Sequence, residues 1–264
     1  MRRLAGCDTS AVHVCTVPPP THAGGVRTSP TATVGQEQNR LLASLPHSDY
    51  ARLLPDLGEV RLDVKRVLAL ADEPMRHVYL PRDVVISLLV SMEDGSAVEG
   101  ASVGNEGMVG LSVFLGNDAP TDEMVVQIAG TAAQIPVESF RKALEHSSAM
   151  RAVLLHYTQA LMSHLARAAG CNRAHSVQER SARWLLMTND RLGRDSFRLT
   201  HESLAGLLGV RRASISEAAE TLQRAGLVEY RAGWMTIVDR HGLEMAACED
   251  YRLVRDAYAL MYRR

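Results

Sequence analysis

The sequence predicts an α+β protein with an N-terminal antiparallel β-roll, a long dimerisation helix and a C-terminal winged helix-turn-helix. Three observations predict this order. Apolar residues alternate with a period of two over residues 58–137, and a helical period of about 3.6 returns after Pro136. Further along, two short helical stretches on either side of Gly209 precede a predicted β-hairpin.

These patterns divide the 264-residue chain into four predicted parts. Residues 1–36 are rich in Pro, Gly, Ser and Thr and lack an apolar period, so they are expected to be a disordered tail. The tail carries no long apolar segment, and no secretory signal is therefore predicted. The other parts are a β-roll sensor domain over 37–147, a dimerisation helix with a hinge over 148–174, and a winged helix-turn-helix with a C-terminal helix over 175–264.

Composition narrows the class of protein. The formal net charge is -1, so a face that binds nucleic acid has to be local. No apolar run approaches the roughly 18 residues of a membrane span, and the chain is expected to be cytoplasmic. The four cysteines (Cys7, Cys15, Cys171 and Cys248) are far apart and form no C-x-x-C motif, so neither a disulfide framework nor a zinc site is predicted.

The β-roll is predicted from short runs of Val, Ile and Leu. Residues 39–54 have helical apolar spacing and precede the first strand. Six to eight strands are expected between 58 and 137, with Asp94 and Gly95 as a hairpin turn. Residues 137–145 then form a short helix. Strands of this spacing are typical of an antiparallel barrel or roll.

A long helix is predicted from about Ser148 to Gly170. Apolar positions recur along it at alternating spacings of four and three, as in the seam of a two-helix coiled coil. The seam residues are Met150, Leu154, Tyr157, Leu161, His164 and Ala168. Packing of this row against the chain's own barrel is an equally good interpretation. A second apolar set lies beside this row and consists of Leu155, Met162 and Leu165. The helix can therefore pack on its own barrel and on a second chain, so a homodimer is predicted. Residues 172–174 are expected to form the hinge.

The C-terminal part has the order of a winged helix-turn-helix. An amphipathic helix covers 175–192, Thr200 caps the next helix and Gly209 ends it. Another helix follows over 212–225, and then a hairpin around Arg231, Ala232 and Gly233. Residues 241–262 add a terminal helix.

Arg211 and Arg212 stand at the start of the second short helix, where the helix dipole opposes cations. An interaction with a partner outside the helix has to compensate for this unfavourable position of the two arginines. In a helix-turn-helix this end enters the major groove of DNA, and the arginine fork matches the edge of guanine. Ser214 and Ser216 can contact bases or phosphates. Residues 176–240 hold ten Arg and eight acidic residues. A winged helix that binds protein rather than DNA is the alternative, and salt-dependent DNA affinity distinguishes the two.

Two stretches resemble the Crp/Fnr superfamily of dimeric bacterial transcription regulators. "LTHESLAGLLGVRRASISEAAETLQRAGLVEYRAGWMTIVDRHGLE" resembles its DNA-binding domain, and "VYLPRDVVISLLVSMEDGSAVEGASVGNEGMVGL" resembles its sensor. The resemblance covers residues 39–240. It implies a homodimer that reads an inverted repeat in double-stranded DNA and works with RNA polymerase.

The resemblance also assigns DNA contacts. The implied DNA-binding residues are Thr200, His201, Arg211, Arg212, Ser214, Ser216 and Arg231. Thr200 and His201 are expected to meet phosphate. Ala213 and Glu217 stand where Glu and Arg are common in the superfamily, so the target sequence is expected to differ from that of its best-known members.

The sensor departs further from the superfamily pattern. Its cyclic-nucleotide binders hold the ligand with a Gly-Glu pair and a downstream Arg, whereas Leu111 follows Gly110 here, and residues 103–140 contain no Lys or Arg. Backbone amides around Gly104, Gly107, Gly110 and Leu111 make the candidate effector pocket. Because a buried phosphate needs a cation, cyclic AMP and cyclic GMP are not expected to be effectors. A cyclic-nucleotide-responsive regulator is the alternative.

The sequence gives little support for an iron–sulfur cofactor or for a metal-dependent enzyme. The four thiolates of an iron–sulfur cluster are not available in the superfamily's arrangement, because no Cys lies between Cys15 and Cys171. Cys171 and Cys248 are expected to be small buried residues. A metal-binding cupin site needs several His, and residues 58–140 contain only His77. Neither catalysis nor a cofactor or metal is therefore predicted.

Overall fold

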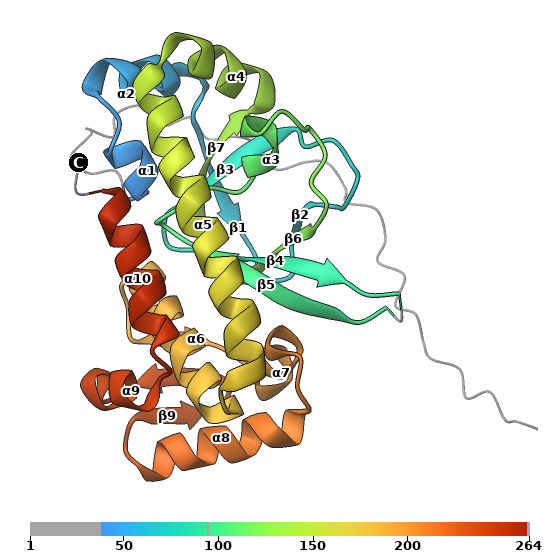
Figure 1. Ribbon diagram of the computed structural model, residues 1–264, viewed down its shortest axis with the longest axis vertical. Helices are drawn as coiled ribbons and strands as arrows, with labels where there is room; N and C mark the ends of the chain where they lie inside the picture. The colour runs from blue at the N-terminus through green and yellow to red at the C-terminus, as the bar shows by residue number, and fades with distance from the viewer. Residues whose placement is uncertain (1–37, 94, 263–264) are drawn as a thin grey trace, which may run out of the picture.

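The fold follows the predicted order from roll to long helix to helix-turn-helix (Figure 1). The computed structural model describes residues 38–93 and 95–262. The tail predicted for residues 1–36, and Asp94 of the predicted hairpin turn, lie outside the described residues. Helix α5 runs along the roll, and the helix-turn-helix lies at one end of the molecule (Figure 1).

Seven antiparallel strands form the roll, within the range predicted. They make a three-stranded sheet of order β1-β7-β3 and a four-stranded sheet of order β2-β6-β4-β5. The strands are β1 Gly58–Leu62, β2 Val67–Ala69, β3 His77–Pro81, β4 Val85–Ser91, β5 Ala97–Val103, β6 Glu123–Ile128 and β7 Gly130–Pro136. Val84, Val85 and Ile86, at the start of β4, are fully buried. The hairpin between β4 and β5 closes where predicted, at Gly95 with φ +81°.

Short helices cover the ends of the roll. They are α1 Arg40–Ala43, α2 His47–Leu53 with the 3-10 turn Leu54–Asp56, α3 Leu111–Phe114 and α4 Val137–His146. The buried Asn39 caps α1 by accepting the Leu42 N–H, and its amide donates to the carbonyls of Pro81 and Gly107. This one side chain therefore fixes where the chain enters the roll.

Helix α5, Ser148–Ala174, buries the predicted seam inside its own chain. Tyr157 is fully buried and donates a hydrogen bond to the Met108 carbonyl (3.0 Å). His164 lies 3.3 Å from the Tyr258 hydroxyl of the terminal helix. Leu154 and Leu161 are buried as well. The interpretation of this row as an intermolecular seam was wrong, because the roll and the C-terminal helix already cover it.

A second row, displaced by one or two residues from the first, lies exposed on α5. Its members repeat at spacings of three and four: Ala152, Leu155, Gln159, Met162, Ala166 and Ala169. Leu155 is 56% exposed and Met162 is 61% exposed. This row has the spacing of a coiled-coil seam.

The break between the long helix and the next falls later than predicted. Residues 172–174 were expected to be a hinge, but they are the last turn of α5. Asn, Arg and Ala all tolerate helical geometry, so nothing in this triplet ends the helix. The backbone becomes extended at His175, and Ser176 then starts α6, Val177–Leu192, with a capping box formed with Glu179.

The helix-turn-helix and wing have the predicted order with one additional strand. The elements are β8 Ser196–Arg198, α7 His201–Leu208, α8 Arg212–Arg224, β9 Val228–Arg231 and β10 Trp234–Ile237. Thr200 caps α7 by accepting the Ser203 N–H. Gly209 ends that helix with φ +63°, a conformation that glycine adopts easily. Strand β8, which was not predicted, pairs with β10 and widens the wing sheet.

The C-terminal segment forms two helices instead of the single one predicted over 241–262. They are α9 Arg240–Ala246 and α10 Asp250–Met261, separated by residues 247–249, of which Ala247 is extended. The break lets α10 turn back and lie along α5 (Figure 1). No helix in the part of the chain that the structure describes has the length and apolar character of a membrane span.

Candidate nucleic-acid interface

The arginine pair is exposed at the start of α8. Arg211 is the N-cap residue of this helix and Arg212 is its first residue. Arg212 Nε lies 3.8 Å from Glu202 Oε2, but both side chains are at least 70% exposed. An exposed ion pair of this kind stabilises by about 1 kcal/mol at most, so it leaves the guanidinium available to a partner. Ser214 follows on the same helix and is half-buried.

His201 joins α7, α8 and the wing. Its ring stacks on Tyr230 with centroids 4.5 Å apart, and its Nδ1 lies 3.1 Å from the Ser216 hydroxyl. Burial, followed by the charge of Arg212, lowers the pKa of His201, which favours the neutral ring. Ser216 therefore points back to α7. Thr200 remains exposed, although its hydroxyl also caps α7.

The wing contributes residues that the sequence analysis missed. Arg231 is exposed at the end of β9, as expected for a wing contact. The guanidinium of Arg198 lies 5.9 Å from the ring of Trp234, which is 48% exposed. Arg198 lies on β8, the strand that was not predicted. A three-residue strand gives too short an alternating pattern to recognise from sequence.

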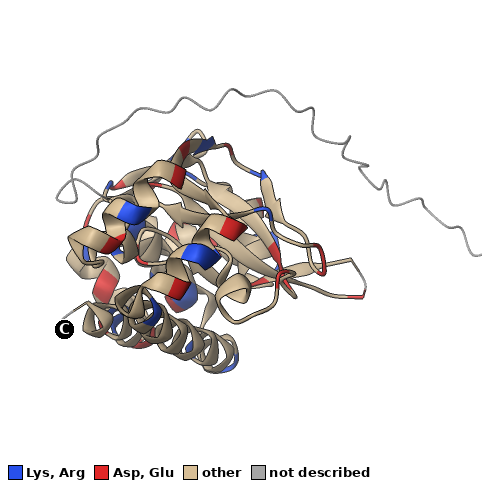
Figure 2. Cartoon of the chain, turned by 90° about the horizontal axis from the view of Figure 1, so that it is seen from above, with Lys and Arg blue, Asp and Glu red and all other residues tan. Residues whose placement is uncertain are grey.

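Some arginines of residues 176–240 are buried or paired, so only part of the local positive charge is exposed. Three of the ten Arg in residues 176–240 are buried on α6, and Arg240 pairs with Asp190. The six that remain exposed are Arg194, Arg198, Arg211, Arg212, Arg224 and Arg231. The view onto the opposite, roll end shows blue and red residues interspersed, without a continuous face of one sign (Figure 2).

A family model described as the Crp-like helix-turn-helix domain matches residues 179–246. FixK2 from Bradyrhizobium japonicum superposes with a TM-score of 0.63 at 18% identity, over 73% of this chain and 98% of that one. A CRP-family transcriptional regulator from Thermus thermophilus gives a TM-score of 0.57 at 21% identity, over 71% of this chain and 96% of that one.

The chain has the Crp/Fnr fold and a Crp-like helix-turn-helix domain. The resemblance found in the sequence is thus confirmed for the fold and for the helix-turn-helix domain at residues 179–246. The c-di-GMP-responsive regulator CLP of Xanthomonas campestris also superposes, with a TM-score of 0.56 at 17% identity over 73% of this chain and 99% of that one. A search of curated proteins found no match.

Side chains of the long helix and of the helix after it cover two glycines of the candidate effector pocket, Gly107 and Gly104. A Cβ at Gly104 would lie 2.4 Å from the stem of Arg191, and one at Gly107 would lie 2.5 Å from the Tyr157 hydroxyl. Gly110 has φ +106° and precedes α3, which starts at Leu111. These glycines permit close approach of helices α5 and α6 to the roll.

Arg191 brings to this loop the cation that residues 103–140 lack. Its Nε lies 2.9 Å from Glu106 Oε1, and its other nitrogens donate to the hydroxyl and carbonyl of Ser102. Burial opposes the charge of Arg191, but the anionic groups around it, first among them Glu106, raise its pKa. The guanidinium is therefore already neutralised by the protein. A cavity of about 60 Å³ lies beside this pair.

A second contact joins α6 to the roll. Trp184 Nε1 donates to Glu99 Oε1 at 3.0 Å, and Ser87 donates to the other carboxylate oxygen. Loss of hydration on burial raises the pKa of Glu99 in spite of these hydrogen bonds. The turn after α7 also meets the roll, since a Cβ at Gly209 would lie 3.3 Å from Val98. The helix-turn-helix is thus in direct contact with the β4–β5 hairpin.

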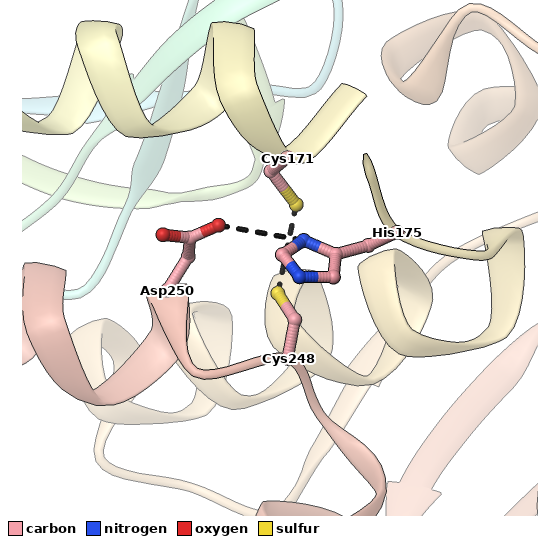
Figure 3. A group of neighbouring side chains, drawn as sticks. All are labelled: Cys171, His175, Cys248 and Asp250. Atoms are coloured by element: carbon pink, nitrogen blue, oxygen red, sulfur yellow. Dashed lines mark hydrogen bonds and ion pairs between the residues drawn. The ribbon is translucent and has the colours of Figure 1, made fainter. Parts of the chain in front are cut away.

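A group of side chains that could hold a metal ion lies at the junction of α5 and α6 (Figure 3). It consists of Cys171, His175, Cys248 and Asp250. A hydrogen bond between the thiols lowers the pKa of Cys171 to about 7 and raises that of Cys248. Both cysteines are buried, as the sequence predicts. The available signals were the spacings C-x-x-x-H and C-x-D, which lie more than 70 residues apart.

Proposed function

We propose that the protein is a homodimeric regulator that binds a specific inverted-repeat sequence in double-stranded DNA. The observation that carries the proposal is the exposed Arg211–Arg212 pair at the N-terminus of α8, within a Crp-like helix-turn-helix. A recognition helix enters the major groove by this end. Arg212 would read a guanine through its fork, and Arg211 would contact phosphate or a second base.

The other predicted contacts surround this helix end. Ser214 is close enough in the chain to reach the same groove, and the Thr200 hydroxyl at the start of α7 would meet a phosphate. His201 and Ser216 act on the DNA indirectly, because their mutual contact fixes α7 against α8. Arg231 and Arg198 of the wing extend the positive surface toward the flanking backbone.

The dimer would form along the exposed row of α5. Two copies that pack Leu155 and Met162 against each other would place two α8 helices on one side of the DNA. Half-sites would then lie about 34 Å apart, one turn of the double helix. Replacing Leu155 and Met162 together by Lys should give folded monomers in sedimentation. A matched control replaces two exposed leucines outside the row, Leu54 and Leu115, and should stay dimeric.

The effector is proposed not to be cyclic AMP or cyclic GMP. Gly104 and Gly107 lie under side chains of α6 and α5, and the nearby cation, Arg191, is paired with Glu106. A cyclic phosphate would have to displace this pair. Calorimetry with the folded protein should give no saturable heat for either nucleotide. A stoichiometric isotherm in the micromolar range would overturn this part of the proposal.

The whole proposal is tested by selecting bound fragments from genomic DNA, followed by affinity measurement at several salt concentrations. Recovered fragments should share an inverted repeat, and affinity should fall steeply as salt rises. Failure to retain DNA at low salt would favour a winged helix that binds protein. On promoter DNA the regulator would act in the cytoplasm beside RNA polymerase. Retention of polymerase together with the regulator on the selected fragments tests this.

A further inference from the structure

Four side chains from three segments converge at the α5–α6 junction (Figure 3). Cys171 lies in the last turn of α5, His175 marks the break before α6, and Cys248 and Asp250 lead into α10. One ligand atom from each residue can be chosen so that all four lie within 4.8 Å of one another. Cys171, Cys248 and Asp250 are buried.

The spacing of the two sulfur atoms fits shared coordination. The sulfurs of Cys171 and Cys248 lie 3.5 Å apart. A disulfide requires about 2.05 Å. Two thiolates on one tetrahedral zinc ion, each with a bond of about 2.3 Å, lie about 3.8 Å apart. The observed distance is thus close to one edge of a zinc tetrahedron.

The surroundings orient the other two ligands. His175 Nε2 lies 3.1 Å from Glu249 Oε2, while its Nδ1 is buried, has no hydrogen-bond partner among the described residues and lies 3.5 Å from Asp250 Oδ2. A carboxylate on the outer nitrogen of a histidine is the usual support for a metal ligand. Arg167 lies 3.4 Å from Asp250 Oδ1, which leaves Oδ2 directed into the cluster.

Two buried cations beside the sulfurs supply an independent indication. Arg180 and Arg183 are each 6% exposed, and within the described residues neither has a carboxylate at ion-pair distance. The Nε of each has no hydrogen-bond partner there. Buried cations are costly unless anions accompany them. Two thiolates at Cys171 and Cys248 would provide that charge, and the thiolate is the form of cysteine that binds metals.

We propose that Cys171, His175, Cys248 and Asp250 bind one zinc ion through two sulfurs, a nitrogen and an oxygen. Two thiolates with an imidazole select zinc over the hard cations magnesium and calcium. Binding replaces the two thiol protons, which pass to solvent, and the lone pair of His175 Nδ1 binds the metal. No electron is transferred, so the step needs neither oxidant nor reductant.

The bound metal would hold together the end of α5, the first residue after it and the start of α10. These segments set the direction in which α6 leaves α5, and α6 carries the helix-turn-helix. The inference does not depend on DNA binding, because its readout is the metal itself.

The experiment uses the full chain with Cys7→Ser and Cys15→Ser, so that the two N-terminal thiols cannot contribute. The reduced protein is loaded with zinc, freed of excess ion and analysed for metal. We expect about one zinc per chain, as for a closed four-ligand site. Replacement by cobalt should give tetrahedral ligand-field absorption together with a thiolate-to-cobalt charge-transfer band.

Variants then assign the ligands. Cys171→Ser and Cys248→Ser should each lose the charge-transfer intensity of one thiolate, whereas His241→Ala, an exposed histidine nearby, should change nothing. Glu249→Gln should weaken zinc affinity about 10- to 100-fold by chelator competition, because it removes the support of His175. Absence of zinc from the folded parent chain, or a cobalt complex without a thiolate band, would overturn the proposal. So would a chain that binds no zinc when reduced and forms a Cys171–Cys248 disulfide on exposure to air, with oxygen as the oxidant.

Discussion

Helices α6 and α8 both carry arginines, and the two sets have opposite surroundings. On α6, Arg180, Arg183 and Arg191 are buried. At the start of α8, Arg211 and Arg212 are exposed, and the ion pair of Arg212 with Glu202 is itself exposed and weak. Local net charge is therefore a poor guide to a DNA-binding face, because it counts buried and exposed arginines alike. Buried cations serve the fold, and only the exposed ones remain for a partner.

The two helices differ because α6 is central and α8 is peripheral. Helix α6 packs against α8, α9, α10 and the roll, so its arginine stems fill space while two of the three guanidinium groups bond to a carbonyl or a carboxylate. The guanidinium of Arg180 reaches the Leu208 carbonyl, and that of Arg191 reaches Glu106 and Ser102. Helix α8 buries only the face that carries Ile215, Ala218, Ala219 and Leu222.

The largest expected effect is on the buried set. Arg191→Ala should lower the free energy of unfolding by about 3–5 kcal/mol, because it leaves Glu106 buried without its ionic partner. Urea unfolding measures this. The double variant Arg191→Met with Glu106→Gln removes both charges and should recover much of the loss. A single variant within about 0.5 kcal/mol of the parent, the range of ordinary surface substitutions, would show that Arg191 is not a structural cation.

The exposed set should affect binding instead of stability. Arg212→Ala should weaken binding to the selected site by about 1–3 kcal/mol and relax the preference at one base pair. That corresponds to about 5- to 150-fold in dissociation constant. Unfolding by urea should be unchanged. Binding as tight as that of the parent chain would remove Arg212 from the groove.

Glu99 tests the contact between α6 and the roll through pH. Its pKa is raised above the ordinary value of 4.5, so the folded state holds this proton more tightly than the unfolded state does. Stability from Glu99 is therefore fully present below about pH 4.5 and is lost as pH rises through the folded pKa. Glu99→Gln keeps partners for Trp184 and Ser87. The stability of this variant relative to the parent should thus increase with pH across that window, and a constant difference would contradict the burial of a charged Glu99.

The smallest effect is expected at the far end of α8. Arg224 is exposed at the last residue of this helix, about 18 Å from Arg212 at the helical rise of 1.5 Å per residue. Arg224→Ala should change stability by no more than about 0.5 kcal/mol. DNA affinity should fall far less than for Arg212→Ala, and specificity should stay the same. Equal losses for the two variants would indicate that charge alone, without position, governs binding.

Local signals in the sequence were sufficient for the helix-turn-helix. Thr200 can cap α7 with its own hydroxyl, and Gly209 can adopt the positive φ that ends that helix. Ala232 and Gly233 both have positive φ in the wing turn. These features act between residues a few positions apart, so they can be recognised without knowledge of the rest of the fold. The alternation of strands in the roll could be predicted for the same reason.

By itself, then, the sequence determined the order of the elements, their caps and turns, and the position of the arginine pair at a helix start. The tertiary structure decided which apolar row of α5 faces the protein, because Leu154 and Leu155 belong to two rows with the same period and only the neighbouring elements distinguish them. It also decided which arginines stay exposed, and it brought Cys171 next to Cys248 across 77 positions. Helical periodicity records which side chains share a face, whereas burial and long-range contact depend on what packs against that face.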